Sequence, residues 1–312
     1  MEYGDKHILV LGAGASGIGA SWVLAQVGAH VVLNDYKPVT LPADEEKRLV
    51  SAGVDIITGR QDESLLDGVD RIVISPGISL DIPIVKAAQD RGIDVVSEVE
   101  LAYEVSKSPI VAVTGTNGKT TTTTLLTKVL EGSGKPVRVG GNIGDSLSEV
   151  AYSMPAGGFL VAELSSYQLE TIKHFRPIGA IMLNITPDHL ARHKTMENYI
   201  AAKERIFENQ LKSDYLVLNI DDSVVADMEH RAPSHILQIS QKQTVENGAY
   251  YANGQCYVVE NNVATAVIGD EDIHIPGSHN IENILTVIAL TYALGVPVVE
   301  IHRIISEFHG VE

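Results

Sequence analysis

The 312-residue sequence contains one cysteine, Cys256, and few basic residues for its length. A single cysteine can form neither an internal disulfide nor a metal site built from several thiolates. The 23 lysines and arginines are outnumbered by 40 aspartates and glutamates, which gives a formal net charge of −17. This balance argues against a general nucleic-acid binder, because phosphate backbones select basic surfaces. It does not exclude a nucleotide ligand, whose phosphates a few local cations can hold.

Long hydrophobic runs are also missing. No apolar run is long enough to span a bilayer, and the start "MEYGDKHILVLG" lacks a basic region followed by an apolar run of signal-peptide length. We therefore expect a soluble, cytoplasmic protein that binds neither membranes nor nucleic acids. We also expect a monomer, although no feature of the sequence fixes the oligomeric state. A chain of 312 residues is long enough for two domains, each with its own core.

Apolar runs of strand length alternate with helix-like segments through most of the chain. The first third contains "HILVLG", "HVVLND", "RIVISPG" and "DVVSE", and helical patterns near residues 16–27, 44–52 and 83–91 separate some of these runs. Further runs follow as "PIVAVTG", "FLVAELS", "AIMLNIT" and "YLVLNID". Repeated strand–helix units with strands buried on both faces predict an α/β protein with parallel sheets covered by helices.

The stretch "YEVSKSPIVAVTG" resembles a joint between domains, because a polar segment with Pro109 ends one pattern and an apolar strand begins another. We predict a boundary near Lys107, with domains at 1–106 and 107–312. Residues 234–276 contain short strand-like runs with Asn-Gly turns, which predict a small antiparallel sheet within the second domain.

The sequence "GAGASG" places Gly12, Gly14 and Gly17 between a predicted strand and a predicted helix, and Asp35 ends the next strand. Such glycines let the backbone approach a diphosphate at the start of a helix, and an acid in that position can contact a ribose or a base. The first domain is therefore predicted to be Rossmann-like. NAD, FAD and a nucleotide-sugar diphosphate all suit this turn, and so does a tight turn with no ligand.

The sequence "GTNGKT" at residues 115–120 also joins a strand to a helix. Backbone amides of this loop would surround phosphates, Lys119 would reach the β and γ oxygens, and Thr120 would bind Mg²⁺. It is not a strict Walker A sequence, because Val113 stands where the first glycine is required. The pattern predicts an ATPase-like P-loop domain. A threonine-rich helix cap is the alternative, but it does not require Lys119.

Several candidate ligands follow this loop. Glu163 ends a predicted strand, Asp188 and His189 follow another, and Lys203 lies on an amphipathic helix. Acids at the carboxyl ends of parallel strands lie where such sheets bind ligands. Taken singly, the histidine is as well explained by packing and the lysine by a solvated surface. Three asparagines stand at turns or helix starts, where they would cap the helix or contact a nucleotide: Asn142, Asn280 and Asn283.

Together these motifs resemble the Mur ligase family, and within it the members that add D-glutamate. The resemblance rests on "GAGASGIGA", "ISPGIS", "VTGTNGKTTTT", "GGNIG", "ELSSYQLE", "LNITPDHL", "AAKERIFEN", "NIDD" and "PGSHNIEN", in this order. It implies an ATP-dependent ligase of peptidoglycan synthesis, and hence of cell-wall biogenesis, cell shape and cell division. In such an enzyme the L-alanine carboxylate of UDP-N-acetylmuramoyl-L-alanine becomes an acyl phosphate. The amine of D-glutamate then displaces phosphate to form an amide.

The resemblance also implies roles for individual residues. Substrate contacts would come from Gly14, Ala15, Ser16, Asp35, Tyr36, Ser75, Pro76, Gly77, Asn142 and Ser165. ATP contacts would come from Gly115, Thr116, Asn117, Gly118, Lys119, Thr120, Thr121, Asn280 and Asn283. Two Mg²⁺ ions would be held by Thr120, Glu163, His189 and a carbamylated Lys203, and the catalytic set would be Lys119, Glu163, His189 and Lys203.

Members of the family have a third domain that binds the amino acid, and the resemblance stops short of it at Glu312. We therefore expect the chain to bind UDP-sugar, and ATP weakly, without forming product. Two other classes stay open from the residues. An NAD-dependent oxidoreductase would explain "GAGASG" but not "GTNGKT", and a non-catalytic nucleotide-binding module would bind without turnover. A relative that adds another amino acid, or a folate polyglutamate synthase, shares the ATP motif.

Overall fold

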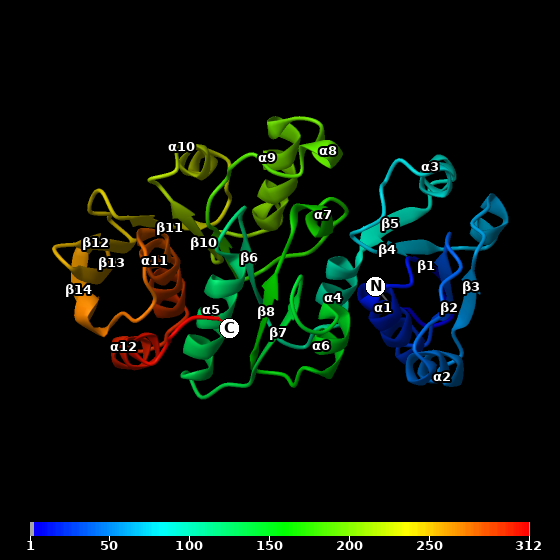
Figure 1. Cartoon of the computed structure of the whole chain (residues 1–312), viewed down its shortest axis with the longest axis horizontal. Coiled ribbons are helices and arrows are strands. Elements are labelled where there is room, and N and C mark those ends of the chain that lie inside the picture. Colours follow the sequence, from blue (N-terminus) through cyan, green and yellow to red (C-terminus); the bar gives the residue numbers. More distant parts are fainter. Residues whose placement is uncertain (1–2, 312) are drawn as a thin grey trace. The chain divides into compact units, whose positions relative to one another are not determined.

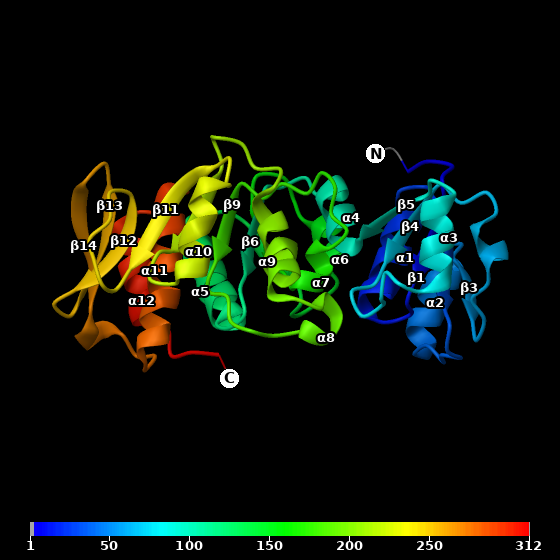
Figure 2. The same ribbon diagram turned by 90° about the horizontal axis from the view of Figure 1, so that it is seen from above.

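Residues 3–311 are described by the computed structural model, and their contacts divide into two packed units (Figures 1 and 2). The first unit consists of the chain up to Lys107 together with Gly144–Met154 and Tyr167–Phe175. The second consists of Ser108–Ile143, Pro155–Ser166 and the chain from Arg176 onward. Two segments of the later sequence therefore belong to the first unit by packing.

The first unit is built on a five-stranded sheet, within the part of the chain that the structure describes, in the order β3-β2-β1-β4-β5. All of its strand pairs are parallel. The strands are β1 (His7–Leu11), β2 (His30–Asp35), β3 (Asp55–Thr58), β4 (Arg71–Ile74) and β5 (Asp94–Ser97). The helices are α1 (Ala15–Gln26), α2 (Ala43–Ser51), α3 (Pro83–Asp90), α4 (Glu98–Val105) and α6 (Leu147–Ser153).

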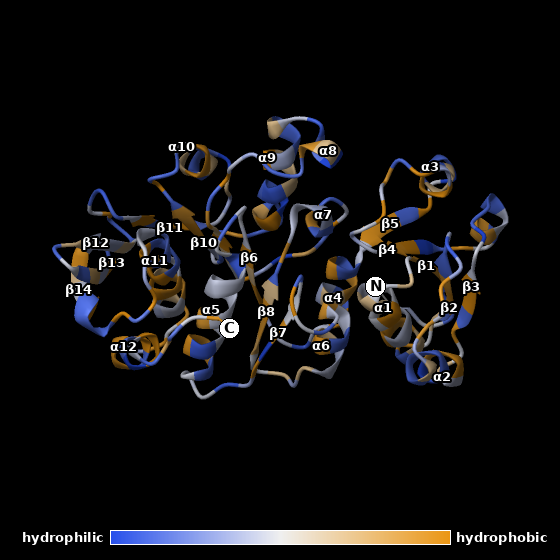
Figure 3. Cartoon of the chain, viewed as in Figure 1, coloured by the Kyte–Doolittle hydropathy of each residue, from blue (hydrophilic) through white to orange (hydrophobic). Residues whose placement is uncertain are grey.

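Both faces of this sheet are covered. Residues of α1, α2 and α4 pack with alternate residues of the strands on one face, among them Leu24, Leu49 and Leu101. On the other face α3 supplies Ile84 and Val85. Burial on both faces explains why the strands read as continuous apolar runs. In Figure 3 hydrophobic colouring follows the strands, while helices such as α3 and α12 (Val298–Ser306) alternate between hydrophobic and hydrophilic residues.

The second unit contains a nine-stranded sheet among the described residues, in the order β14-β13-β12-β11-β10-β9-β6-β8-β7. Its strands are β6 (Ile110–Thr114), β7 (Val137–Gly141), β8 (Phe159–Glu163), β9 (Gly179–Met182), β10 (Tyr215–Asn219), β11 (His235–Ser240), β12 (Gly248–Ala252), β13 (Gln255–Glu260) and β14 (Val263–Gly269). Its other helices are α5 (Lys119–Glu131), α8 (Leu190–His193), α9 (Met196–Glu204), α10 (Ser223–Asp227) and α11 (Ser278–Ala293), while α7 (Ser166–Leu169) begins at the last residue of one of its segments.

Helices α5, α11 and α12 share one hydrophobic core with the sheet of the second unit. In Figure 1 α9 and α10 lie on the opposite side of this sheet. The strands β6, β8 and β9 are parallel neighbours, so their carboxyl ends meet at one edge. Short 3₁₀ turns occur at Glu63–Leu66, Arg205–Phe207, Met228–His230 and Asp270–Asp272.

The α/β class with parallel sheets is confirmed. The antiparallel strands expected within residues 234–276 are present as the pairs β12–β13 and β13–β14. They do not form a separate sheet, because β12 pairs parallel with β11, and β11 pairs parallel with β10. The larger sheet simply continues into an antiparallel edge.

Some elements were not predicted. Helix α4 runs into the stretch that resembles a domain joint, and it ends at Val105. Strand β7 and helix α6 flank the glycine-rich sequence that was expected to be only a turn. No helix within residues 3–311 has the length and apolar character needed to cross a membrane.

Candidate functional site

The second glycine turn lies between β6 and α5, as the sequence predicts. Gly115 has φ of 150° and Gly118 has φ of 84°, a backbone region that side chains disfavour. A Cβ at Gly118 would lie 2.6 Å from Asn283 Oδ1. Gly118 is the N-cap residue of α5, and no side chain caps this helix. The first amides of α5 are therefore available for an anion, which the helix N-terminus favours.

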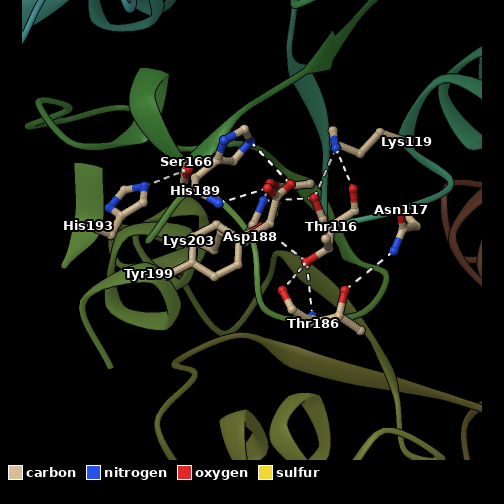
Figure 4. A network of polar contacts seen from close by, with 12 residues as sticks. Thr116, Asn117, Lys119, Ser166, Thr186, Asp188, His189, His193, Tyr199 and Lys203 are labelled. Carbon is tan, nitrogen blue, oxygen red and sulfur yellow. Dashed lines mark hydrogen bonds and ion pairs between the residues drawn. The ribbon is translucent and has the colours of Figure 1, made fainter. Parts of the chain in front are cut away.

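Two lysines converge on the carbonyl of Gly115 (Figure 4). Lys119 Nζ donates to this oxygen at 3.1 Å and to the Thr116 carbonyl at 2.9 Å. Lys203 Nζ reaches it from α9 at 2.7 Å and also donates to Thr114 Oγ1 at 3.2 Å. Lys203 is 2% exposed. The sequence pattern predicted that Lys203 lies on an amphipathic helix. In the structure its side chain is buried inside the second unit, against the second glycine turn.

Burial lowers the pKa of Lys203 to about 7, and the nearby positive charge of Lys119 acts in the same direction. The carboxylate of Asp188 opposes this shift. Burial also lowers the pKa of Lys119, against the opposing charges of Glu163 and Asp188. Because the charged form is disfavoured in a poorly solvated site, a substantial fraction of Lys203 is a neutral amine near neutral pH.

Tyr199 links these groups, and the sequence analysis did not single it out. It is 1% exposed, and its hydroxyl lies 3.0 Å from Thr116 Oγ1. Lys203 Nζ lies 5.1 Å from the centre of its ring, and the His189 and His193 rings lie at 6.3 and 5.3 Å. Its position four residues before Lys203 puts both side chains on one face of α9. The four-residue spacing from Lys203 was the sequence feature that could have identified Tyr199.

Glu163 ends β8, where it is 1% exposed. Its Oε1 accepts from Asn142 Nδ2 at 2.9 Å, and its backbone carbonyl accepts from the Asn142 amide, also at 2.9 Å. A Cβ at Gly141 would overlap this carbonyl, so the close approach of β7 to β8 requires glycine there. Oε2 of Glu163 is buried and has no hydrogen-bond partner among residues 3–311. The structure thus brings together Asn142 and Glu163, which were predicted separately, and leaves one carboxylate oxygen available.

His189 follows β9 in a left-handed conformation with φ of 53°. Its amide donates to Asp188 Oδ1 at 2.7 Å, and its Nε2 lies 3.4 Å from Asp188 Oδ2. Both side chains are exposed. The carboxylate therefore orients the imidazole, as carboxylates orient histidine ligands of metals. A few residues on, His193 Nε2 lies 2.9 Å from Ser166 Oγ, a buried contact that sequence reasoning missed.

Asparagines fix the shape of the loop. The Asn117 amide donates to Asn184 Oδ1 at 2.8 Å, and Asn184 Nδ2 donates back to the Asn117 carbonyl at 3.1 Å. Asn283 is buried against Gly118, and its Nδ2 donates to Asn280 Oδ1 at 3.1 Å. The predicted residues Asn280 and Asn283 thus lie at the loop. Asn184 was missed, although it directly follows a buried strand.

The first glycine turn lies in the other unit. Gly12 has φ of 102°, and a Cβ there would lie 2.7 Å from Ser75 Oγ. A Cβ at Gly17 would overlap the Gly12 carbonyl oxygen, so this glycine lets α1 start directly against the strand end. Asp35 accepts from the Ala13 amide at 3.0 Å and from the Lys37 amide at 2.9 Å. The carboxylate of Asp35 therefore holds the turn in place.

The other residues predicted to bind the substrate differ in exposure and in the unit to which they belong. Gly14, Ala15 and Gly77 are exposed, and Tyr36 is 69% exposed. Ser165 belongs to the second unit, two residues after the strand that ends in Glu163. The first turn itself contains no basic residue, in contrast to the second.

A family model described as the Mur ligase middle domain matches residues 113–291, more than half of the chain. The chain belongs to the Mur ligase family. A second model, described as the Mur ligase MurD-like N-terminal domain, matches residues 6–97 of this Mur ligase chain.

Curated relatives named UDP-N-acetylmuramoylalanine--D-glutamate ligase match this Mur ligase chain along its full length. The protein of that name from Thermoanaerobacter pseudethanolicus is 44% identical over 312 residues, which are 100% of this chain and 69% of the relative. The one from Caldanaerobacter subterraneus subsp. tengcongensis is 45% identical, over 100% of this chain and 68% of the relative. The chain thus spans about two thirds of the length of these relatives.

Solved structures of the family share the fold. The UDP-N-acetylmuramate:L-alanyl-gamma-D-glutamyl-meso-diaminopimelate ligase from Neisseria meningitides aligns with a TM-score of 0.66 at 21% identity, and the match covers 99% of each chain. At this identity the similarity supports the α/β fold of the Mur ligase chain and nothing more specific.

Mur ligases are ATP-dependent enzymes that form amide bonds in peptidoglycan precursors, and they use Mg²⁺. The residues present fit these groups. The free amides of α5 suit phosphate, and the partnerless Glu163 Oε2 suits a hard cation that prefers oxygen ligands. Within residues 3–311 no group of three or more histidine, cysteine, aspartate or glutamate side chains is assembled for a metal. Oxygens of phosphate and water would therefore have to complete the coordination.

Proposed function

We propose that this chain binds ATP and Mg²⁺ at the second glycine turn and UDP-N-acetylmuramoyl-L-alanine at the first, and that its residues serve the addition of D-glutamate to the L-alanine carboxylate. The observation that carries the proposal is the convergence of Lys119 and Lys203 on the Gly115 carbonyl beside Glu163, inside a Mur ligase middle domain. The substrates are those named by the D-glutamate ligases that match the whole chain.

The reaction proposed has two steps. The L-alanine carboxylate attacks the γ-phosphorus of ATP, the bond to the β–γ bridging oxygen breaks, and an acyl phosphate and ADP form. The amine of D-glutamate then attacks the acyl carbon, phosphate leaves, and the amine loses a proton. Lys119 would place its charge against the β and γ oxygens, and the amides of α5 would hold them in line. Bound Mg²⁺ would supply further neutralisation of phosphate charge.

We propose that two Mg²⁺ ions are held, with Thr120 and Glu163 on one and His189 on the other. Thr120 is exposed in the first turn of α5, Glu163 offers the free Oε2, and His189 is oriented by Asp188. These are oxygen and imidazole ligands, which suit the cation when phosphate oxygens provide the remaining positions.

Lys203 is the fourth proposed ligand, as a carbamate. A neutral amine adds CO₂ and releases a proton, which converts a buried cation into an anionic oxygen ligand. The lowered pKa and the 2% exposure of Lys203 support this modification. ¹³C NMR spectra of the protein in ¹³C-labelled bicarbonate should show a signal from the carbamate carbon, and this signal should be absent in Lys203→Met. A spectrum that is identical for both proteins would contradict it.

Roles at the first turn are proposed from the similarity to the Mur ligase family. We propose that amides at Gly14, Ala15 and Ser16 contact the diphosphate at the start of α1, with Asp35 and Tyr36 on the uracil side. The loop after β4 would add Ser75, Pro76 and Gly77, and Asn142 and Ser165 would contact the sugar-peptide end. The division into domains near Lys107, action in the cytoplasm and a monomeric state stay predictions.

The experiment that tests the function is calorimetric titration of the chain with UDP-N-acetylmuramoyl-L-alanine and, separately, with ATP and Mg²⁺. We expect both to bind, and we expect Lys119→Ala to weaken ATP binding while the UDP-sugar still binds. NADH is the control ligand for the first turn. Binding of NADH in place of the UDP-sugar would contradict the proposal. Asp35→Ala is a poor probe, because it also releases the amides of Ala13 and Lys37.

A further inference from the structure

A second buried acid, Glu98, lies in the first unit and has no part in the function proposed above. It is the first residue of α4 and is 2% exposed. Its Oε1 accepts from the Ser148 amide and the Ser148 hydroxyl, each at 2.9 Å, and from the Ser146 hydroxyl. Its Oε2 is buried and has no partner of hydrogen-bond geometry in the described part of the chain. One oxygen of the carboxyl group is thus saturated and the other is unused.

The surroundings of Glu98 are tightly packed. Gly19 of α1 lies against Ser146, so that a Cβ at this glycine would overlap the serine hydroxyl. Arg48 of α2 pairs with Glu149 of α6 at 2.5 Å, and its guanidinium lies 5.2 Å from the Trp22 ring. The carboxyl group therefore lies where α4 packs with α6 and α1, and it is shielded from water.

Ser16 connects this acid to the glycine turn. It lies in the first turn of α1, one helical turn before Gly19, whose Cβ position meets Ser146, and its side chain acts to lower the pKa of Glu98. Ser16 is also one of the residues proposed to meet the diphosphate. The same side chain is thus near the buried carboxyl group and, under the proposed function, near the diphosphate.

The protonation of Glu98 decides what this hydroxyl can do. A hydroxyl has one proton to donate and two lone pairs to accept with. If Glu98 is a carboxylate, the Ser16 hydroxyl donates its proton to Glu98 and directs a lone pair toward the diphosphate. The negative charge of the diphosphate then repels this lone pair. Beside a carboxylic acid, Ser16 accepts the proton on Oε2 and is free to donate its own to a phosphate oxygen.

Burial raises the pKa of Glu98, and hydrogen bonds from Ser146, Ser148 and Ser16 act against this shift. The charged groups nearest to it on the neighbouring helices are Glu149, which lies beside Gly19 as Ser146 does, and Arg48, and these two form an ion pair with each other. Glu100 on the same helix points elsewhere, since its oxygens accept from the amides of residues 173–175. A bound diphosphate would disfavour the ionised form further, because like charges in a buried site repel.

We propose that Glu98 is a positioning residue for the UDP-sugar: in its protonated form it orients the Ser16 hydroxyl as a donor to the diphosphate. This inference rests on the proposed function, which places the UDP-sugar at the first glycine turn. It makes ligand binding and proton uptake at Glu98 a linked pair.

The test is calorimetric titration with UDP-N-acetylmuramoyl-L-alanine from mildly acidic to mildly alkaline pH, in buffers of different ionisation enthalpy. The wild-type chain should take up protons on binding and lose affinity as pH rises, by about tenfold once Glu98 ionises. Glu98→Gln should keep the high affinity at every pH, because its amide always donates to Ser16. Ser16→Ala should bind weakly at every pH.

Glu100→Gln is the matched control, a buried acid on the same helix that does not face the turn, and it should keep the wild-type pH profile. Fluorescence of Trp22, the only tryptophan, verifies that the first unit is folded in each variant. A wild-type chain that binds no UDP-sugar at any pH would overturn the proposed function. Binding with the same pH profile in wild type and Glu98→Gln would overturn the role of Glu98 alone. So would loss of binding in a folded Glu98→Gln.

Discussion

The two glycine turns join a strand to a helix in the same way, yet they hold charge differently. The turn at 115–118 has Lys119 and the buried Lys203 on one carbonyl. The turn at 12–17 has no basic residue, and the buried group behind it is an acid, Glu98. The same backbone device can therefore serve two purposes.

The difference fits the chemistry asked of each ligand. A triphosphate that is cleaved develops and transfers charge, so cations aimed at its oxygens contribute to catalysis. A diphosphate that only anchors a substrate can be held by backbone amides and a helix N-terminus. It needs no cation, because none of its bonds is broken. Under the proposed function, the first turn only holds its ligand, whereas the second also takes part in the reaction of its ligand.

The largest expected effect concerns the glycines themselves. Gly17→Ala should destabilise the first unit by about 3 kcal/mol or more, because its Cβ meets the backbone oxygen of Gly12, which cannot move away. Gly118→Ala should cost the second unit about 1–3 kcal/mol, because φ is positive but the neighbour is the Asn283 side chain. Urea unfolding, followed by Trp22 fluorescence for the first unit and circular dichroism for both, measures this. Gly77→Ala, with open space around it, is the control, and equal effects for all three would remove the distinction.

Lys203 gives the second unit a dependence on pH. The pKa of Lys203 is about 7 in the folded chain, against an ordinary value of 10.5, so between these values the unfolded chain binds a proton that the folded chain lacks. The free energy of unfolding should therefore rise with pH, by about 2–3 kcal/mol between pH 7 and pH 9. Lys203→Met should abolish this rise in CO₂-free buffer, and the exposed Lys212→Met should retain it. A slope that survives in Lys203→Met would show that Lys203 is not its source.

Lys119→Ala should weaken binding of ATP and Mg²⁺ by about 1.5–3 kcal/mol, or roughly 10- to 150-fold, because charge-assisted contacts to phosphate are lost. The exposed Lys128 at the other end of α5 is the control, and Lys128→Ala should bind ATP normally. The UDP-sugar should bind equally well to all three proteins. A parallel loss of UDP-sugar affinity in Lys119→Ala would mean that the two turns do not act separately.

The smallest effect is expected at Tyr36, which is 69% exposed next to Asp35. Tyr36→Ala should reduce affinity for the UDP-sugar by about 1 kcal/mol through lost stacking on the uracil, without change in stability. Lys37→Ala is the control, since Lys37 contacts Asp35 through its backbone amide. Calorimetry that finds no loss for Tyr36→Ala would remove the aromatic ring from the site.

Much of the architecture could be predicted from the sequence. The buried strands and both glycine turns follow from apolar periodicity and from glycine at positions of positive φ, both local properties. The helix α4 before the expected joint near Lys107 was harder to predict, because its acidic residues suggest an exposed polar segment. Glu98 and Glu100 are buried in the structure and bonded to serines and to backbone amides far along the chain. No local pattern shows that such partners exist.

By itself the sequence determined the two turns, the α/β class and the residue types that handle phosphate, because these depend on neighbours along the chain. Only the tertiary structure decided which charged side chains are buried and therefore have shifted pKa values. Lys203 and Glu98 read as ordinary charged residues, and only packing against distant elements removes their solvation and shifts their pKa values in opposite senses. The segments 144–154 and 167–175 likewise join the first unit only through contacts. Desolvation depends on everything that surrounds a group in space, and a linear sequence does not contain that information directly.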